Sequence, residues 1–392
     1  MQEAYIVGGF RTAVAKAKKG GFRFYRPDDL AVEVIKGLVA TMPQLDTKRI
    51  DDVIVGNAVP EAEQGLQFGR IIAAKALGIE VPGITINRYC ASGLEAIAMA
   101  TAKIRTGMAE CIIAGGTESM SLVPTAGWKT VPSYNIAKDD PDYYLSMGLT
   151  AEAVAKEFKV SREAQDEFAT ASHRKAATAI ANGYFKEGIL PIAVEQVYVD
   201  EKGKRKAKTY TVEVDEGVRP DTTPEVLSRL KPAFAMNGSV TAGNASQTSD
   251  GAAFVMVMSE RMANELGIQP IGRLVNCASA GVHPRIMGIG PVAAVPKVLQ
   301  QANMSLDDIE LIELNEAFAS QSIAVINQLR LNPEIVNING GAIALGHPLG
   351  CTGAKLTIQL LHDMKRLNKK YGMVTACVGG GQGIAGVIEH IG

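Results

Sequence analysis

A histidine and two cysteines, each followed closely by glycine, are the residues of this chain best suited to chemistry. His347 lies in Gly-His-Pro-Leu-Gly at 346–350, and Cys377 opens Cys-Val-Gly-Gly-Gly at 377–381. Cys90 lies far upstream in Asn-Arg-Tyr-Cys-Ala-Ser-Gly-Leu, at a predicted strand-to-helix turn. Glycine has no Cβ, so backbone amides can approach a substrate closely there. Two thiols, one imidazole and several glycine amides suggest acyl transfer through a thioester.

Cys90 is the candidate nucleophile and His347 its candidate base. A thiolate is a strong nucleophile, and a helix N-terminus is expected to lower the pKa of the Cys90 thiol. An imidazole, with an ordinary pKa of about 6.5, can accept a thiol proton near neutrality. The alternative for Cys90 is a buried structural cysteine. A metal site made of His347 and Cys351 lacks the third and fourth ligands that zinc needs.

Six sequence blocks in order carry a family resemblance. They are Asn-Arg-Tyr-Cys-Ala-Ser-Gly-Leu at 87–94, Gly-Gly-Thr-Glu-Ser-Met-Ser at 115–121, Thr-Ala-Gly-Asn-Ala-Ser at 241–246, Asn-Glu-Ala-Phe-Ala at 315–319, and the His347 and Cys377 blocks. Together they resemble the thiolases, coenzyme A (CoA)-dependent enzymes that cleave or join 3-ketoacyl thioesters. The blocks span nearly the whole chain.

The resemblance implies a role for each reactive group. Cys90 would carry the acyl group as a thioester, with His347 as its base. Cys377 would be the second acid/base, which exchanges the proton at C2 of acetyl-CoA. A water held by Asn315 would stabilise the thioester oxygen together with His347, and the amides of Cys90 and Gly379 would stabilise the tetrahedral intermediate.

The resemblance also implies contacts to CoA, which would be a substrate; no permanently bound cofactor and no metal are expected. Ser246 matches a serine that bonds the pantetheine arm, and Met147 matches a methionine beside the acyl thioester. Arg219 falls where thiolases place an arginine near the adenine, although a solvated surface arginine is an equal alternative. Glu316 would orient the site or cap a helix.

Within the family, the blocks look more like the degradative 3-ketoacyl-CoA thiolases of fatty-acid β-oxidation. Biosynthetic acetoacetyl-CoA thiolases (acetyl-CoA C-acetyltransferases) usually carry histidine before the Met-Gly pair, where this chain has Ser146. They also carry Val-Cys-Gly-Ser-Gly at the nucleophile, in place of Tyr-Cys-Ala-Ser-Gly at 89–93. The biosynthetic enzyme stays open as an alternative. A catalytically silent, thiolase-like lipid carrier would lack one of the blocks, and a ketosynthase would pair one cysteine with two histidines.

The elements that position these residues repeat along the chain. Val-Ile-Val-Gly-Asn at 53–57 resembles Leu-Ile-Glu-Leu-Asn at 311–315, and Gly93 parallels Gly353. Apolar helical periodicity at 30–38 and 93–104 alternates with short apolar strands at 53–55, 111–114 and 373–376. This alternation predicts an α/β protein with helices packed against mixed sheets. The region at about 119–248 breaks the pattern and predicts an insertion, with a helix at 161–181 and a charged hairpin at 199–206.

The resemblance implies the α/β thiolase fold, with two duplicated βαβαβ-type halves in a five-layer α-β-α-β-α arrangement and helices between two mixed sheets. Residues 1–270 would form the N-terminal half, including the inserted loop domain at about 119–248 that cradles CoA. Residues 271–392 would form the C-terminal half.

Composition supports a globular enzyme. The 392 residues are 47% hydrophobic and 21% charged with a net charge of −1, which gives no electrostatic case for binding nucleic acid or an anionic membrane. No apolar run reaches the length of a membrane span. Five cysteines without CxxC spacing favour a reduced, cytoplasmic protein. A GxGxxG match at 381–386 lies too near the C-terminus for a dinucleotide fold.

The resemblance implies a homodimer or homotetramer that binds acyl-CoA and CoA, with a multifunctional β-oxidation subunit as a further partner.

Overall fold

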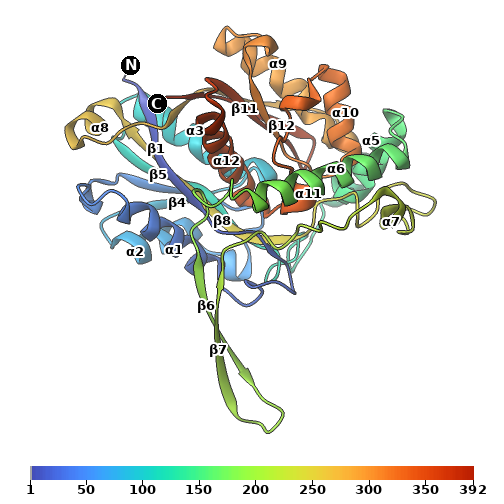
Figure 1. The fold of residues 1–392 in the computed structure, drawn as a ribbon, viewed down its shortest axis with the longest axis horizontal. Helices are drawn as coiled ribbons and strands as arrows, with labels where there is room; N and C mark the ends of the chain where they lie inside the picture. The colour runs from blue at the N-terminus through green and yellow to red at the C-terminus, as the bar shows by residue number, and fades with distance from the viewer. Residues whose placement is uncertain (1) are drawn as a thin grey trace.

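The computed structural model describes residues 2–392, which fold around one continuous mixed sheet (Figure 1). Neighbouring strands follow the order β4 (Gly83–Ile86), β3 (Asp52–Gly56), β5 (Cys111–Ser119), β8 (Ser249–Ser259), β1 (Ala4–Arg11), β9 (Gly272–Gly281), β12 (Gln382–His390), β11 (Tyr371–Val378) and β10 (Leu311–Leu314). The two-residue strand β2 (Ala15–Lys16) pairs with β8. Five residues of the GxGxxG match at 381–386 lie in the last strand, β12, which begins at Gln382.

Strand order and direction repeat in the two parts of this sheet. In the first, β3 runs parallel to β5, β5 antiparallel to β8, and β8 antiparallel to β1. In the second, β10 runs parallel to β11, β11 antiparallel to β12, and β12 antiparallel to β9. This repeat supports the duplication, and we keep 1–270 and 271–392 as the proposed halves.

The expectation of two mixed sheets was wrong in one respect, because the two parts are joined at their edges. Strands β1 and β9, each at the edge of its own part, meet antiparallel at Ile6 and Gly272. The amide of Ile271 also donates to the carbonyl of Ile6, at 2.9 Å. An edge strand presents unpaired backbone groups, and this contact satisfies some of them on both edges. The two parts are therefore joined into one sheet.

Helices form three layers around the two parts of the sheet. Helices α1 (Pro27–Ala40) and α2 (Phe68–Leu77) pack on the outer face of the first part. Helices α9 (Gly290–Ala302) and α10 (Ala319–Leu329) pack on the outer face of the second. Between them lie α3 (Ser92–Arg105) and α12 (Thr352–Leu367).

Side chains of one strand alternate between these layers. Val53 and Val55 pack in the outer core with α1, whereas Ile54 packs in the central core with α3. On β11, Met373 faces α9, and Val374 faces the central helices. This is the period of two that a strand buried on both faces must show. The result is the five-layer arrangement that the sequence predicted.

The two central helices cross with almost no space between their first turns. A Cβ on Gly93 would lie 2.7 Å from the amide nitrogen of Ala354, and a Cβ on Gly353 would lie 2.2 Å from that of Leu94. Only glycine permits this approach. The crossing therefore holds the N-terminal ends of α3 and α12 together, and these are the ends that follow Cys90 and His347.

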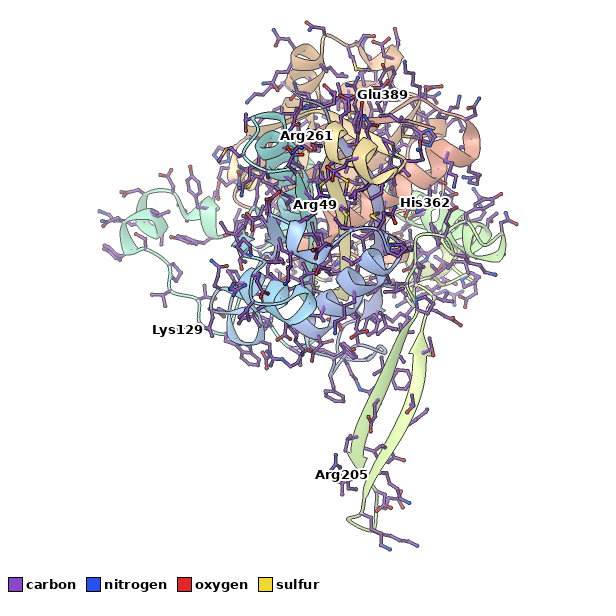
Figure 2. The ribbon with its side chains drawn as sticks, turned by 90° about the vertical axis from the view of Figure 1, so that its left-hand side faces the viewer. Arg49, Lys129, Arg205, Arg261, His362 and Glu389 are labelled. Carbon is purple, nitrogen blue, oxygen red and sulfur yellow. The ribbon has the colours of Figure 1, made fainter. Side chains whose placement is uncertain are left out.

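The region 119–248 forms the inserted elements seen at the right and bottom of Figure 1. It contains α4 (Tyr134–Asp139), α5 (Met147–Glu157), α6 (Arg162–Ala181), β6 (Ile192–Val199), β7 (Arg205–Val212) and α7 (Pro224–Ser228). As predicted, α6 begins after Ser161, whose side chain accepts from the amide of Ala164, and β6 pairs with β7 as a hairpin. The hairpin projects from the body with Arg205 near its tip, and a separate arm carries Lys129 (Figure 2).

Two short helices complete the described chain, α8 (Glu260–Leu266) and α11 (Ala342–Leu345). Within residues 2–392, no helix combines the length and the apolar character that crossing a bilayer requires.

Candidate active site

Cys90 lies in a tight turn between β4 and α3. The turn Tyr89–Ala91 is a single 3-10 turn, and Tyr89 has a φ of 44°, in the left-handed region that a tyrosine rarely adopts. Asn87 Oδ1 accepts from the amide of Tyr89 at 2.8 Å, and Ser92 Oγ accepts from the amide of Arg88 at 2.9 Å. These two side chains hold the strained turn, which points Cys90 inward, with 8% of its surface exposed.

His347 lies in the loop between α11 and α12, and its hydrogen bonds fix its tautomer. Its Nδ1 is 2.6 Å from Thr352 Oγ1, whose own proton goes to the carbonyl of Pro348 at 2.9 Å. The Thr352 oxygen must therefore accept a proton from Nδ1. On the other side of the ring, Nε2 is 3.3 Å from Nδ2 of the Asn315 side chain. Nε2 thus carries the lone pair and accepts from Asn315 Nδ2, so it is the nitrogen that can act as a base.

Burial keeps this imidazole neutral. Burial, together with the positive charge of Lys355, lowers the pKa of His347 to about 3. At neutral pH the ring is therefore uncharged and able to accept a proton.

Cys377 lies at the end of β11 and is fully buried. It packs in an apolar cluster with Met147, Met287 and Phe318. A Cβ on the next glycine, Gly379, would lie 3.5 Å from the ring of Tyr89, and the backbone amides of Gly379 and Cys90 lie near enough to the Cys90 sulfur to stabilise its thiolate. The structure therefore brings the Cys90 turn of the first half onto the end of β11 in the second.

The expectation of a lowered pKa at Cys90 was wrong. Burial raises the pKa of the Cys90 thiol to about 12, and the amides of Gly379 and Cys90 offset only part of that rise. Removal from water disfavours the thiolate more than a few amide dipoles stabilise it. Burial also raises the pKa of Cys377 well above its usual range, and a negative charge on Cys90 raises it further. Both sulfurs therefore rest as neutral thiols, close enough for the charge of one to affect the other.

Three other predicted residues, Asn315, Met147 and Ser246, lie on segments near this centre. Asn315 directly follows β10, and its amide donates to the carbonyl of Thr375 at 2.9 Å. Met147 opens α5, and a Cβ on Gly379 would lie 3.6 Å from its sulfur. The amide of Ser246 donates to the carbonyl of Ala317, two residues from Asn315.

Arg219 is exposed on the segment that follows Asp215, and its backbone amide donates to Nδ1 of His173 on α6 at 3.2 Å. Its exposure fits the surface-arginine alternative as well as a contact to CoA.

Glu316 is buried and accepts from Ser172 Oγ, Asn337 Nδ2 and the amide of Ile343. It therefore caps α11 and not the helix that follows it in the chain.

Sequence reasoning missed Thr352, the residue that fixes the tautomer of His347. A signal was present, because a threonine at the first position of a helix, five residues after a candidate base, has a hydroxyl within reach of the preceding loop. Of the other cysteines, Cys111 and Cys351 are buried, whereas Cys277 is only partly buried.

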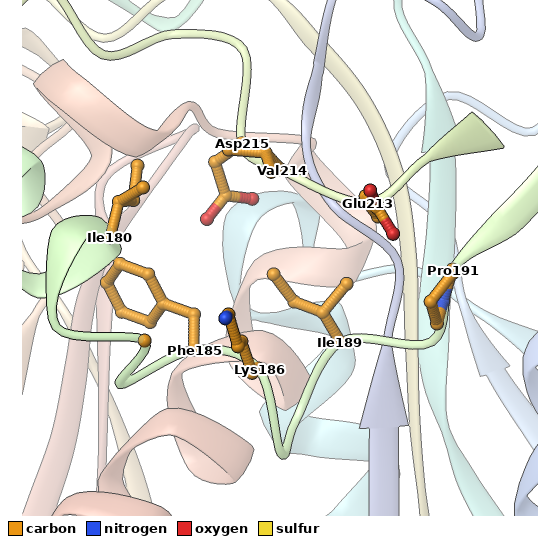
Figure 3. Close-up of a pocket in the computed structure, with 9 residues that line it drawn as sticks. Ile180, Phe185, Lys186, Ile189, Pro191, Glu213, Val214 and Asp215 are labelled. Carbon is orange, nitrogen blue, oxygen red and sulfur yellow. The ribbon is translucent and has the colours of Figure 1, made fainter. Parts of the chain in front are cut away.

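A cavity of about 380 Å³ lies under α6 and the hairpin (Figure 3). None of the predicted site residues lines it. Its buried carboxylate, Asp215, is already paired with Arg11 through bonds of 2.7 and 2.8 Å, so this carboxylate is structural. Within residues 2–392, no three His, Cys, Asp or Glu side chains gather as a metal site would require.

Comparison with known proteins gives a consistent result. Residues 4–261 match the family described as thiolase, N-terminal domain, and residues 268–390 match thiolase, C-terminal domain. A Bacillus subtilis protein named 3-ketoacyl-CoA thiolase is 54% identical over 99% of this chain and 100% of its own. A human protein named peroxisomal 3-ketoacyl-CoA thiolase is 42% identical over 100% of this chain and 91% of its own. The crystal structure of an acetyl-CoA acetyltransferase of Bacillus anthracis superposes with a TM-score of 0.89 at 38% identity, covering 100% of this chain and 99% of that one.

Proposed function

This chain belongs to the thiolase family of acyltransferases, and from that premise we propose that it cleaves 3-ketoacyl-CoA with CoA, giving acetyl-CoA and a shortened acyl-CoA. The observation that carries the proposal is the packing of the Cys90 turn against the end of β11, where a Cβ on Gly379 would lie 3.5 Å from the ring of Tyr89 and Cys377 lies on the same strand. A neutral His347, with its lone pair on Nε2, lies beside Asn315 in the same centre.

In the first half-reaction, Nε2 of His347 takes the proton of the Cys90 thiol, and the thiolate attacks the C3 carbonyl of the substrate. The bond between C2 and C3 then breaks, which leaves the acyl group on Cys90 and releases the enolate of acetyl-CoA. Cys377 protonates this enolate at C2. Its raised pKa suits that step, because an acid must still hold its proton when the carbanion forms.

The enolate carries negative charge on its thioester oxygen, which needs preorganised donors. Asn315 Oδ1 is buried and accepts no hydrogen bond from the described residues. It can therefore accept one from a water, whose second proton donates to the thioester oxygen. The protonated His347 Nε2 is the other donor.

In the second half-reaction, the thiol of CoA gives its proton to the Cys377 thiolate and attacks the acyl carbon on Cys90. The tetrahedral oxyanion is stabilised by the amides of Cys90 and Gly379, which lie near the sulfur. Collapse of this intermediate breaks the bond to Cys90 and releases the shortened acyl-CoA, and the Cys90 thiolate takes back its proton from His347. Ser246 and Met147 would hold the pantetheine arm and the acyl thioester, with Arg219 near the adenine.

The degradative subtype is the better supported of two candidates. The names of the relatives at 54% and 42% identity are those of 3-ketoacyl-CoA thiolases. The structure at 38% identity is that of an acetyl-CoA acetyltransferase, which favours the biosynthetic candidate. A silent lipid carrier is the least supported, because all four reactive groups are in place.

Thiolysis assays with 3-ketoacyl-CoA substrates of increasing chain length test this proposal. We expect kcat/KM to be retained or to increase beyond acetoacetyl-CoA. Activity confined to acetoacetyl-CoA would favour the biosynthetic enzyme. If the folded protein transfers no acyl group from any substrate, the silent lipid carrier is the remaining candidate.

We also propose that the active form is a homodimer or homotetramer, on the family resemblance. Light scattering across micromolar concentrations tests it, and a monomer throughout that range would contradict it.

A further inference from the structure

Glu118 is a buried carboxylate that the proposed reaction does not use. It lies at the end of β5, in the block 115–121, and 1% of its surface is exposed. Its Oε2 accepts from the amides of Ala58 and Gly350, both at 2.8 Å. Its Oε1 accepts from Gln64 Nε2 at 2.8 Å and Asn57 Nδ2 at 3.2 Å. The carboxylate thus joins two loops of the first half to the loop that carries His347.

Glycines allow the backbones of these segments to approach each other closely. A Cβ on Gly116 would lie 2.0 Å from the carbonyl oxygen of Gly350. A Cβ on Gly350 would lie 2.7 Å from the Cα of Asn57 and 2.8 Å from Glu118 Oε2. The backbone of the 346–350 loop thus packs directly on the backbone at the ends of β3 and β5, with no room for a side chain between them. The position of the His347 loop is therefore set by the ends of β3 and β5.

The strand register shows that this contact is the counterpart of the catalytic centre. On β3 and β5, Gly56 lies opposite Gly116; on β10 and β11, Leu314 lies opposite Thr375. One residue beyond the first strand of each pair is an asparagine, Asn57 or Asn315. Glu118 lies two residues after Gly116, and Cys377 lies two residues after Thr375.

The partners of Glu118 and Cys377 correspond in the same way. Cys90 is the middle residue of the 3-10 turn before α3, and Gly350 is the middle residue of the 3-10 turn before α12. Cys90 lies beside Cys377, and Gly350 donates its amide to Glu118. The duplication therefore produced two equivalent centres, of which one has reactive groups and the other a carboxylate with amide donors.

We propose that the second centre is a clamp, in which Glu118 is a positioning residue that fixes the 346–350 loop so that His347 meets Cys90. A measurement of turnover rests on the proposed function, whereas a measurement of the reactivity of the Cys90 thiol does not. Loss of the clamp lets His347 move away from the nucleophile, and displacement of a catalytic group by about 1 Å can cost a factor of about 100 in rate.

Two variants separate position from charge. Glu118→Gln keeps the shape but turns a donor toward the surrounding N–H groups. Glu118→Asp keeps the charge but is one methylene too short to reach both loops. The negative charge of Glu118 raises the pKa of Cys90, so charge alone would make Glu118→Gln more reactive and leave Glu118→Asp unchanged. The clamp predicts that both variants become slower.

The first measurement is the alkylation rate of Cys90 by iodoacetamide at one fixed, mildly alkaline pH, followed by mass spectrometry with peptide mapping. His347→Ala sets the rate without the base. Asp363→Asn, a buried carboxylate held by Asn339 and Arg366, is the matched control. We expect both Glu118 variants to approach the His347→Ala rate and Asp363→Asn to keep the wild-type rate.

The second measurement is turnover, in which kcat should fall about 100-fold with KM nearly unchanged. Faster or unchanged alkylation in the Glu118 variants would overturn the proposal, as would an equal loss in Asp363→Asn. If Glu118→Gln does not fold, Glu118→Asp decides alone. Alkylation requires no acyl-CoA, so this outcome stays distinct from a failure of the proposed reaction.

Discussion

At the residue scale, the reactivity of Cys90 depends on a proton acceptor and not on a preformed thiolate. A thiol with a pKa of about 12 is almost fully protonated at neutral pH. The base must therefore be neutral, close and presented through the correct nitrogen. His347 meets the first condition through burial and the last through Thr352.

Thr352→Val should slow acylation of Cys90 by about 10–100-fold, since it removes the oxygen that holds the proton on Nδ1 of His347. Thr352→Ser retains the hydroxyl and should recover most of the rate. Single-turnover acylation by acetyl-CoA, followed by intact-protein mass spectrometry, measures both. Equal rates in the valine and serine variants would show that the hydroxyl has no part in orienting the ring.

The two thiols should fail differently. Cys90→Ser should abolish the acyl-enzyme, because His347 cannot ionise a hydroxyl comparably. Cys377→Ser should still be acylated by acetyl-CoA, yet lose deuterium exchange at the acetyl methyl group by about 10²–10⁴-fold. Wild-type exchange in Cys377→Ser would refute the role proposed for Cys377.

At the element scale, the crossing of α3 and α12 places the two reactive turns together. Helical periodicity predicted α3, and short apolar runs predicted β3, β5 and β11, because those signals are local to each segment. The crossing, the joining of β1 with β9 and the Glu118 clamp all connect residues far apart in the chain. No local pattern encodes them, although the near-constant spacing of Asn57 from Asn315 and of Glu118 from Cys377 could have paired the two centres.

Gly353→Ala should destabilise the protein by at least about 1–3 kcal/mol, because its methyl group would press on the backbone of Leu94. Gly37→Ala on α1 is the matched control, since its methyl group meets only the end of the Leu190 side chain. Urea unfolding measures both. If the two variants lose similar stability, the tight crossing is not what makes Gly353 necessary.

At the scale of the whole molecule, stability should depend on pH through buried neutral histidines. Burial, with help from the charge of Arg219, lowers the pKa of His173 to about 4. In the unfolded chain the same group has a pKa of about 6.5. Between these values the unfolded chain binds more protons, so the contribution of His173 is full above about pH 6.5 and is lost as the pH falls toward 4.

His173→Gln keeps an acceptor for the amide of Arg219 but cannot titrate. The difference in unfolding free energy between wild type and this variant should therefore shift against the wild type by about 2–3 kcal/mol between pH 7 and pH 4.5. Urea titrations at several pH values measure it. A difference that does not change with pH would mean that His173 titrates alike in both states.

The strand β1 has its partners very late in the sequence. Residues 4–11 pair with 253–259 on β8 and meet β9 at Gly272, so all of the inserted region separates β1 from its neighbours. At the ribosome, where elongation adds about 5–20 residues per second, roughly 12–50 s would pass before β8 is made. Throughout that time the nascent chain would carry an apolar strand without neighbours. Translation itself thus imposes a waiting period on this fold, during which a chaperone would have reason to hold its N-terminus.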